Sequence, residues 1–431
     1  MKKENIVKLV WVFVEKIVLT LLAFISNILI IRALGGEGFG ALSYYYLIVY
    51  LIFTLSDLGF RRVYLSMRDS AYKRQFFNYL LKTKFLLLIP STAIISYYLR
   101  GSIPDYQLVT IAVLTLLQPI QSYFYICQSK LKIKQISLFH IVIESISSFS
   151  KIAVFYVSDN MIFHVVLIHF TVSIVKLIGY LMLSEENLVR DMKLFFTPIK
   201  SRVKKLNYSN SYRALYLFMS LILLTYYNKL DQLIVEAKFG FYALGIYVAA
   251  YKFIEQIISL LGMINSFLLP MISNENKAEK LESITTIYII SIVVSISLAI
   301  FMYALGGHII RFTLGEEYSE SIAILELLAI SLPMLFLSNV GGIYYSVQKI
   351  EHLALIRNFL SCAVMFTLGH LLTNRMGLEG IAVALIVTSF FNVFIFEILH
   401  RKTRFNVTLK IQSIKQLLSI HFWKKLAHDI K

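Results

Sequence analysis

Charged side chains are scarce in this sequence. Asp, Glu, Lys and Arg make up 16% of the 431 residues, whereas 58% of the residues are hydrophobic. A soluble domain carries about 25% charged residues. Continuous apolar runs of about 20 residues, enough to cross a bilayer, recur along the whole chain. The composition therefore excludes a soluble globular protein and predicts an all-α polytopic membrane protein.

Cysteine is rare, and the familiar nucleotide and zinc motifs are absent. The two cysteines, Cys127 and Cys362, lie within apolar runs and show no metal-ligand spacing. Neither a GxxxxGKS/T motif nor an HExxH motif occurs, so an ATP-driven pump and a membrane zinc protease are unsupported. We therefore expect no catalytic residues, no metal and no cofactor.

Acidic residues are also few, since 25 Asp and Glu face 42 Lys and Arg and the net charge is +17. In a soluble protein this excess would suggest nucleic acid. In a membrane protein basic residues gather in cytoplasmic loops, so we expect no nucleic-acid partner. The basic residues collect in alternate loops, which predicts an even number of spans and places both termini in the cytoplasm.

Twelve apolar runs are long enough to span the bilayer. We expect these spans at about 8–31, 39–60, 76–99, 105–127, 135–157, 160–183, 210–235, 242–270, 284–305, 319–347, 352–373 and 378–399.

The two halves of the chain begin alike, with a glycine-rich joint between two apolar runs. At an offset of about 205 residues, three residues of the first joint match three of the second: Gly35, Gly40 and Tyr46 fall on Gly240, Gly245 and Tyr251. Glycine supplies the positive φ that a tight reversal between helices needs. The match predicts a parallel internal repeat of six spans per half.

The repeat divides the chain into two lobes and two polar segments. We expect an N-terminal lobe over 1–183, a cytoplasmic linker over 184–209 and a C-terminal lobe over 210–400. Residues 401–431 form a basic cytoplasmic tail, which we interpret as an amphipathic helix on the inner leaflet; an unstructured tail is the alternative.

Ionisable side chains inside the spans are informative, because each costs roughly 2.5–3.5 kcal/mol at a helix centre and tends to face a cavity. Basic residues outnumber acids in the fifth to eighth spans, and such a lining favours an anionic solute. The candidates for the cavity are Arg213, Lys229, Asp231, Lys252, Glu255, Lys151 and Lys176. The candidates for ion coupling are Glu15, Asp57 and Glu144.

Each candidate also has a structural interpretation. Lys252 and Glu255 lie one helical turn apart and could form a structural ion pair, and Asp57 could cap its span. Lys229 and Asp231 lie near the outer end of their span and could be interfacial. Several charged residues near span ends could extend toward the interface: Lys16, Lys82, Lys84, Arg213 and Glu397.

Four stretches resemble a known family. Arg32-Ala33-Leu34-Gly35, followed by Gly38-Phe39-Gly40 and Asp57-Leu58-Gly59-Phe60, is similar to the opening of the polysaccharide-repeat-unit (O-antigen, Wzx-type) flippases. Further similar stretches are 228–232 with 243–251, 314–318 and 377–382. These flippases belong to the multidrug/oligosaccharidyl-lipid/polysaccharide exporter superfamily.

The resemblance implies two six-helix lobes around a central cavity in a bacterial cytoplasmic (inner) membrane. It implies a flippase that moves undecaprenyl-diphosphate-linked oligosaccharide, for O-antigen, lipopolysaccharide or capsule, to the outer leaflet by alternating access. Arg213, Lys229, Asp231 and Lys252 would then line the lumen. The polymerase and the chain-length regulator of the same pathway would be further partners, besides membrane lipid.

Three alternatives differ in what they need. A cation-coupled drug antiporter would usually want an acidic cavity, whereas basic residues dominate here. A membrane polymerase or ligase needs a large catalytic outer loop, and the outer loops are short. A scaffold that transports nothing would not need buried charges.

Overall fold

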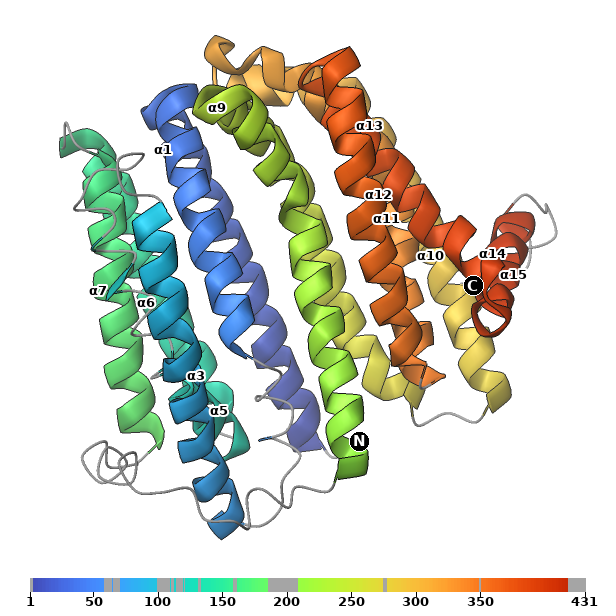
Figure 1. Cartoon of the computed structure of the whole chain (residues 1–431), viewed down its shortest axis with the longest axis horizontal. Coiled ribbons are helices and arrows are strands. Elements are labelled where there is room, and N and C mark those ends of the chain that lie inside the picture. Colours follow the sequence, from blue (N-terminus) through green and yellow to red (C-terminus); the bar gives the residue numbers. More distant parts are fainter. Residues whose placement is uncertain are drawn as a thin grey trace. The chain divides into compact units, whose positions relative to one another are not determined.

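The computed structural model describes most of the chain. The described residues are 3–57, 70–98, 121–130, 133–157, 161–184, 208–273, 277–348 and 350–417, with the single positions 64, 109, 112, 113 and 119. They are almost entirely helical (Figure 1). Eight of the described helices are long and apolar enough to cross a membrane. The predicted all-α polytopic class is thus confirmed.

Two very long helices, α1 (Lys3–Asp57) and α9 (Tyr208–Ser273), each break at one glycine. Gly35 has φ 63° and ψ 179°, and Gly240 has φ 76° and ψ −170°. This backbone region is essentially restricted to glycine. Each helix therefore consists of two arms and holds two of the predicted spans. The two glycines that match in the sequence also share one backbone conformation.

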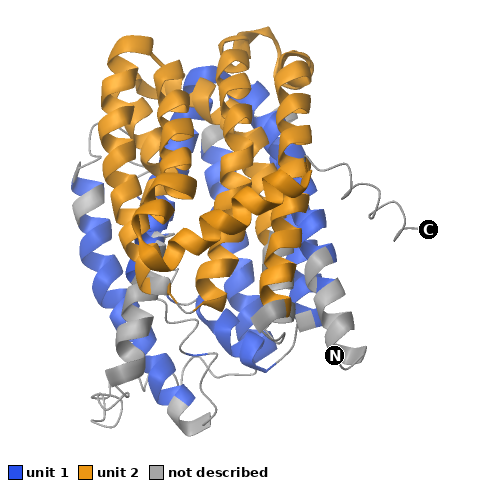
Figure 2. Ribbon diagram, turned by 90° about the vertical axis from the view of Figure 1, so that its right-hand side faces the viewer, with its two compact units in different colours: residues 1–225 blue, residues 226–431 orange. Residues whose placement is uncertain are grey.

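Residues 1–225 form the first of two compact units, blue in Figure 2. Besides α1 and the start of α9, its helices are α3 (Ser70–Tyr98), α5 (Tyr123–Ser129), α6 (Ile133–Val157) and α7 (Met161–Ser184). Helix α1 packs against α3, α6 and α7, and α5 packs against α7. A largely aromatic core cluster includes Phe76, Phe77, Tyr123, Tyr125 and Tyr180. The predicted span at 105–127 lies mostly outside the described residues.

Residues 226–431 form the second unit, orange in Figure 2. After the remainder of α9 come α10 (Lys277–Thr313), a short 3₁₀ turn (Glu316–Tyr318), α11 (Glu320–Val347), α12 (Glu351–Met376) and α13 (Glu379–Phe390). A π-helical turn (Phe391–Ile395), α14 (Phe396–Leu399) and α15 (Arg401–Leu417) follow. Helix α11 packs against α10 and α13, and α15 packs against α10 and α14.

The predicted lobe boundaries stay a prediction. The two compact units meet within α9, between Thr225 and Tyr226. The predicted linker, 184–209, lies almost wholly outside the described residues, and so does the end of the predicted tail after Leu417.

Helix α15 is held to the second unit by a buried polar cluster. The Lys410 Nζ lies 2.7 Å from Glu397 Oε2, and the two side chains are 0% and 1% exposed. Lys410 also donates to the Val393 carbonyl in the π-helical turn, at 2.9 Å. Asn406 Nδ2 donates to both Glu397 oxygens, and the Tyr288 hydroxyl donates to Asn406 Oδ1. Burial lowers the pKa of Lys410, and the neighbouring Glu397 carboxylate opposes that shift.

Two of the residues expected to reach the interface are therefore buried. Glu397 finds its partners on α15, which follows it closely in the chain. Lys84 is 1% exposed, and its Nζ donates to the Tyr125 hydroxyl at 3.1 Å. The interpretation that the Lys84 and Glu397 side chains extend toward water is therefore wrong. Each charge is buried beside a polar partner, which replaces the hydration that the charge loses.

We expect Lys410→Met to destabilise the protein by about 3–5 kcal/mol, because it leaves the Glu397 carboxylate buried without a counter-charge. The measurement is the midpoint of thermal unfolding of the purified protein in detergent. Lys415→Met, at an exposed position of the same helix, should leave the midpoint unchanged. Adding Glu397→Gln to Lys410→Met should recover much of the loss. A double variant as unstable as the single one would contradict the ion pair.

Gly240→Ala should cost about 1–3 kcal/mol through backbone strain alone, since a Cβ at this position meets no atom within 4 Å. Gly342→Ala is the matched control, because Gly342 is an ordinary helical residue in α11 with equally open space. It should be neutral or slightly stabilising. Equal unfolding midpoints for the two variants would show that alanine adopts the Gly240 backbone conformation without strain.

Candidate functional site

The second unit carries a cluster of ionisable and aromatic side chains on the two arms of α9. We call it the α9 cluster and define it as Lys229, Asp231, Tyr247, Tyr251, Lys252 and Glu255. The break at Gly240 lets the second arm fold back beside the first, so residues 16 to 26 positions apart come into contact. The cluster therefore depends on the glycine joint.

Asp231 is the enclosed member of the α9 cluster, with 0% exposure. Its Oδ2 accepts a hydrogen bond from the Tyr247 hydroxyl at 2.6 Å, and its Oδ1 accepts one from the Gln232 N–H at 2.8 Å. The Tyr247 ring stacks on Tyr251 with centroids 6.1 Å apart. Asp231 is therefore enclosed and hydrogen-bonded within the unit, and its position near the outer end of its span stays a prediction.

Two lysines of the α9 cluster share one carboxylate. Glu255 lies 2.7 Å from the Lys252 Nζ and 3.3 Å from the Lys229 Nζ. The side chains keep 33%, 26% and 17% exposure for Glu255, Lys252 and Lys229. The Lys252–Glu255 ion pair that their spacing allows is thus present, and Lys229 adds a second cation. The accessible part of the cluster carries an excess of positive charge, which suits an anionic or hydroxyl-rich ligand.

The first unit contains a hydrogen-bond chain that joins three helices. Glu15 on α1 accepts a hydrogen bond from Ser137 on α6 and lies 2.7 Å from Nδ1 of His140. The other ring nitrogen of His140 lies 2.7 Å from the Tyr180 hydroxyl on α7. Ser137 and His140, three residues apart, share one face of α6, but nothing in the sequence connects them to Glu15. Sequence reasoning therefore missed His140 and Tyr180.

Glu144 pairs with Lys176 on the neighbouring helix α7. The sequence placed Glu144 and Lys151 on one face of α6, and Lys151 does lie within electrostatic range of the Glu144–Lys176 pair. His169 packs its ring against Tyr46, with centroids 5.0 Å apart. The first unit thus gathers Glu15, Glu144, Lys151 and Lys176 along the helices α1, α6 and α7.

For the two remaining candidates, Arg213 and Asp57, the structure describes only the backbone. Arg213 lies on α9 and Asp57 ends α1, but their side chains lie outside the described residues. Their assigned roles stay predictions.

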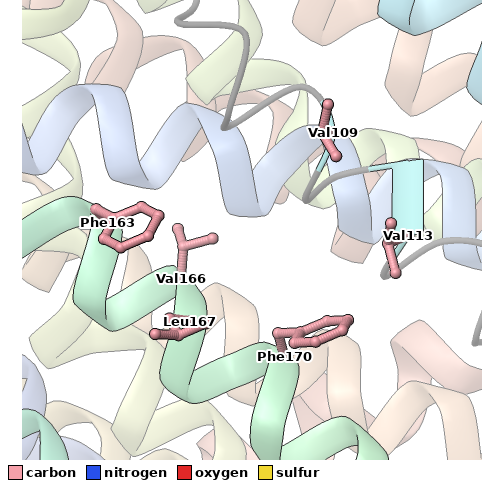
Figure 3. Close-up of a pocket in the computed structure, with 6 residues that line it drawn as sticks. All are labelled: Val109, Val113, Phe163, Val166, Leu167 and Phe170. Atoms are coloured by element: carbon pink, nitrogen blue, oxygen red, sulfur yellow. The ribbon is translucent and has the colours of Figure 1, made fainter.

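An apolar pocket lies beside α7 in the first unit (Figure 3). Its volume is about 180 Å³. The described residues that line it are all hydrophobic, namely Val109, Val113, Phe163, Val166, Leu167 and Phe170. Such a lining accepts hydrocarbon and rejects a polar headgroup. Within the described part of the chain, no three His, Cys, Asp or Glu residues gather to hold a metal ion.

Comparison with solved structures identifies the fold. The chain is similar to the lipid II flippase MurJ in an inward closed conformation, with a TM-score of 0.66 and 15% identity over 96% of this chain and 92% of that one. An inward-facing multidrug resistance MATE family transporter of the MOP superfamily matches with a TM-score of 0.60 and 14% identity, over 92% and 96%. A MOP superfamily transporter from Pyrococcus furiosus matches with a TM-score of 0.57 and 11% identity, over 94% and 96%.

These likenesses show that the chain shares the fold of these membrane transporters and of this flippase. A comparison with curated proteins found no match. The family model described as "Polysaccharide biosynthesis protein" matches residues 7–275, more than half of the chain. The resemblance seen in the sequence is therefore confirmed, and the chain belongs to the polysaccharide biosynthesis protein family.

Proposed function

We propose that this protein is a flippase for undecaprenyl-diphosphate-linked oligosaccharides, such as O-antigen or capsule repeat units. It moves them from the inner to the outer leaflet of a bacterial cytoplasmic membrane by alternating access. The observation that carries the proposal is the family match together with the α9 cluster, in which Lys229 and Lys252 share the single carboxylate of Glu255.

The physical demands of the substrate fit this cluster. An oligosaccharide headgroup has many hydroxyls, and each one carried bare through hydrocarbon would cost a few kcal/mol. Its diphosphate is anionic and would be drawn to the two partly exposed ammonium groups, which form stronger hydrogen bonds than neutral donors do. The lipid chain needs no polar partner and can remain in the bilayer.

The proposal also implies an orientation in the membrane and partner proteins. Both termini would lie in the cytoplasm, and the exposed Arg401, Lys402 and Lys415 of α15 would face anionic lipid of the inner leaflet. The polymerase and the chain-length regulator of the pathway would act on the translocated product. A cation-coupled drug antiporter shares the fold and is the alternative that the tests below separate.

In a strain that lacks this protein, labelled undecaprenyl-linked oligosaccharide should accumulate on the cytoplasmic face of the inner membrane. Expression of the protein should restore it to the outer face, because the polar headgroup does not cross the hydrocarbon unaided. The measurement is the sidedness of the labelled lipid in intact and everted vesicles.

Everted vesicles can also test the alternative function, a cation-coupled drug antiporter. Vesicles with the protein should take up an organic cation such as ethidium no faster than vesicles without it. Unchanged sidedness of the lipid together with faster ethidium uptake would replace the flippase with the drug antiporter.

Lys252→Ala should reduce translocation by roughly tenfold, because it removes one charge-assisted contact to an anionic headgroup. Lys229 remains beside Glu255 in this variant, so the unit should still fold and reach the membrane in normal amount. Translocation is measured by the sidedness assay and protein level by immunoblot of membranes.

Arg375→Ala is the control for Lys252→Ala, because Arg375 is an exposed basic residue at the end of α12. It should translocate at the rate of the unaltered protein. If Lys252→Ala translocates normally, Lys252 does not contact the headgroup, and the Lys252–Glu255 pair is only structural.

A further inference from the structure

Helix α15 begins where the last candidate membrane span of the described chain ends. That span runs from Glu379 to Leu399. His400 follows in an extended conformation, with φ −105° and ψ 126°, and α15 starts at Arg401. Helix α15 also packs against α14, the end of the span (Figure 1). A helix that starts this close to the end of a span lies at the boundary between hydrocarbon and water.

The inner side of α15 is held to the end of the span, which fixes the direction of its outer side. The Thr403 hydroxyl donates to the Glu397 carbonyl at 2.9 Å. Asn406 and Lys410 both bind the Glu397 carboxylate. Thr403, Asn406 and Lys410 are each 0% exposed, and their spacing of three and four residues places them on one side of the helix. The residues on the opposite side therefore point away from the unit.

The outer side of α15 is strongly basic. The helix contains no Asp or Glu. Lys410, on the inner side, is paired with Glu397. The other basic residues of the helix are exposed, and no carboxylate of the described chain forms an ion pair with them: Arg401, Lys402, Arg404 and Lys415. Arg401 and Arg404 lie one helical turn apart, so they can share one phosphate. The outer side therefore favours an anionic partner.

Apolar side chains are exposed among these cations. Phe405 is 47% exposed and Ile411 is 43% exposed. A partner that offers only negative charge would leave both side chains in water. A phospholipid surface suits both kinds of side chain, because the cations reach the phosphate groups while Phe405 and Ile411 contact the upper part of the acyl chains.

The position of Arg404 favours lipid over an acidic protein. Its Nε donates to the Ile398 carbonyl at 3.1 Å, so the side chain lies beside the end of the span. Ile398 and Leu399 are 46% and 72% exposed there. Large apolar side chains that are exposed at the end of a span contact acyl chains. The basic side of α15 therefore adjoins the lipid that surrounds the span.

We propose that the outer side of α15 is a binding site for anionic phospholipid, with its exposed cations on the phosphate groups and Phe405 and Ile411 among the acyl chains. The bound lipid holds α15 against the end of the span, and so keeps the buried Glu397 carboxylate paired with Lys410. The site acts on the protein whatever substrate it moves, so it does not rest on the proposed flippase activity.

The test places a fluorescent probe on the outer side of α15 by Phe405→Trp in the full-length protein. This variant is reconstituted in bilayers of equal parts phosphatidylglycerol and phosphatidylcholine, in which only one of the two lipids carries brominated acyl chains. After subtraction of the signal of the unaltered protein, brominated phosphatidylglycerol should quench the fluorescence at least about threefold more than brominated phosphatidylcholine, because each surface cation attracts the anionic lipid.

Two results of the quenching test would overturn the proposal. Equal quenching by the two brominated lipids would show that the outer side of α15 does not select anionic lipid. Absence of quenching by either lipid would show that this side does not contact the bilayer, and an acidic protein would then be the partner to seek.

Two double variants, each made together with Phe405→Trp, locate the site. Arg401→Gln with Lys415→Gln should make the two brominated lipids quench nearly equally. Arg311→Gln with Arg375→Gln removes the same charge from exposed positions of α10 and α12, and should keep the full preference. Arg401→Gln alone, which should weaken the preference, serves if the first double variant does not fold. An unchanged preference in the α15 variants, or an equal loss in the control, would refute the assignment.

The effect of the lipid on the protein is measured by thermal unfolding in neutral detergent. Added phosphatidylglycerol should raise the unfolding midpoint by about 2 °C or more above the value with the same amount of phosphatidylcholine. Arg401→Gln with Lys415→Gln should lose this difference. Equal midpoints of the unaltered protein in the two lipids would show that bound lipid does not hold α15 in place.

Discussion

The constraint on which the rest of this structure depends is the absence of water in the hydrocarbon of a bilayer. Every backbone N–H and C=O must find its partner within the protein, and helices achieve this within one segment. The same constraint acts on charged side chains. It accounts for the pairing of Lys176 with Glu144 between two spans. Enclosed polar clusters are therefore the informative features of each unit.

The glycine breaks at Gly35 and Gly240 turn two continuous helices into pairs of arms. Only glycine adopts their backbone conformation at low cost, and the break at Gly240 brings distant parts of α9 into contact. Tyr247 reaches Asp231 and Glu255 reaches Lys229 for this reason. A local backbone property thus creates the site that we propose for the anionic headgroup.

The buried charges of the second unit serve different purposes according to their exposure. Lys229, Lys252 and Glu255 stay partly exposed, and we propose that they contact the headgroup. Glu397 and Lys410 are fully enclosed and hold α15 in place. Arg357 is enclosed as well, and its guanidinium packs on the Tyr345 ring with 4.9 Å to the ring centre. Exposure and pairing together distinguish the charges that a ligand could reach from those that hold helices together, which residue type alone would not.

The sequence by itself determined the fold class, the glycine joints and the ion pair between Lys252 and Glu255. These depend on hydrophobic run length, on a residue that tolerates positive φ, and on spacing within one helix, all of which are local. Only the tertiary structure decided that Glu15 meets His140, that Asp231 is enclosed by Tyr247, and that Glu397 is buried against Lys410. Contacts between different helices, or between two arms of one, depend on how those segments pack. The periodicity of one segment does not indicate which residues of another segment its side chains will contact.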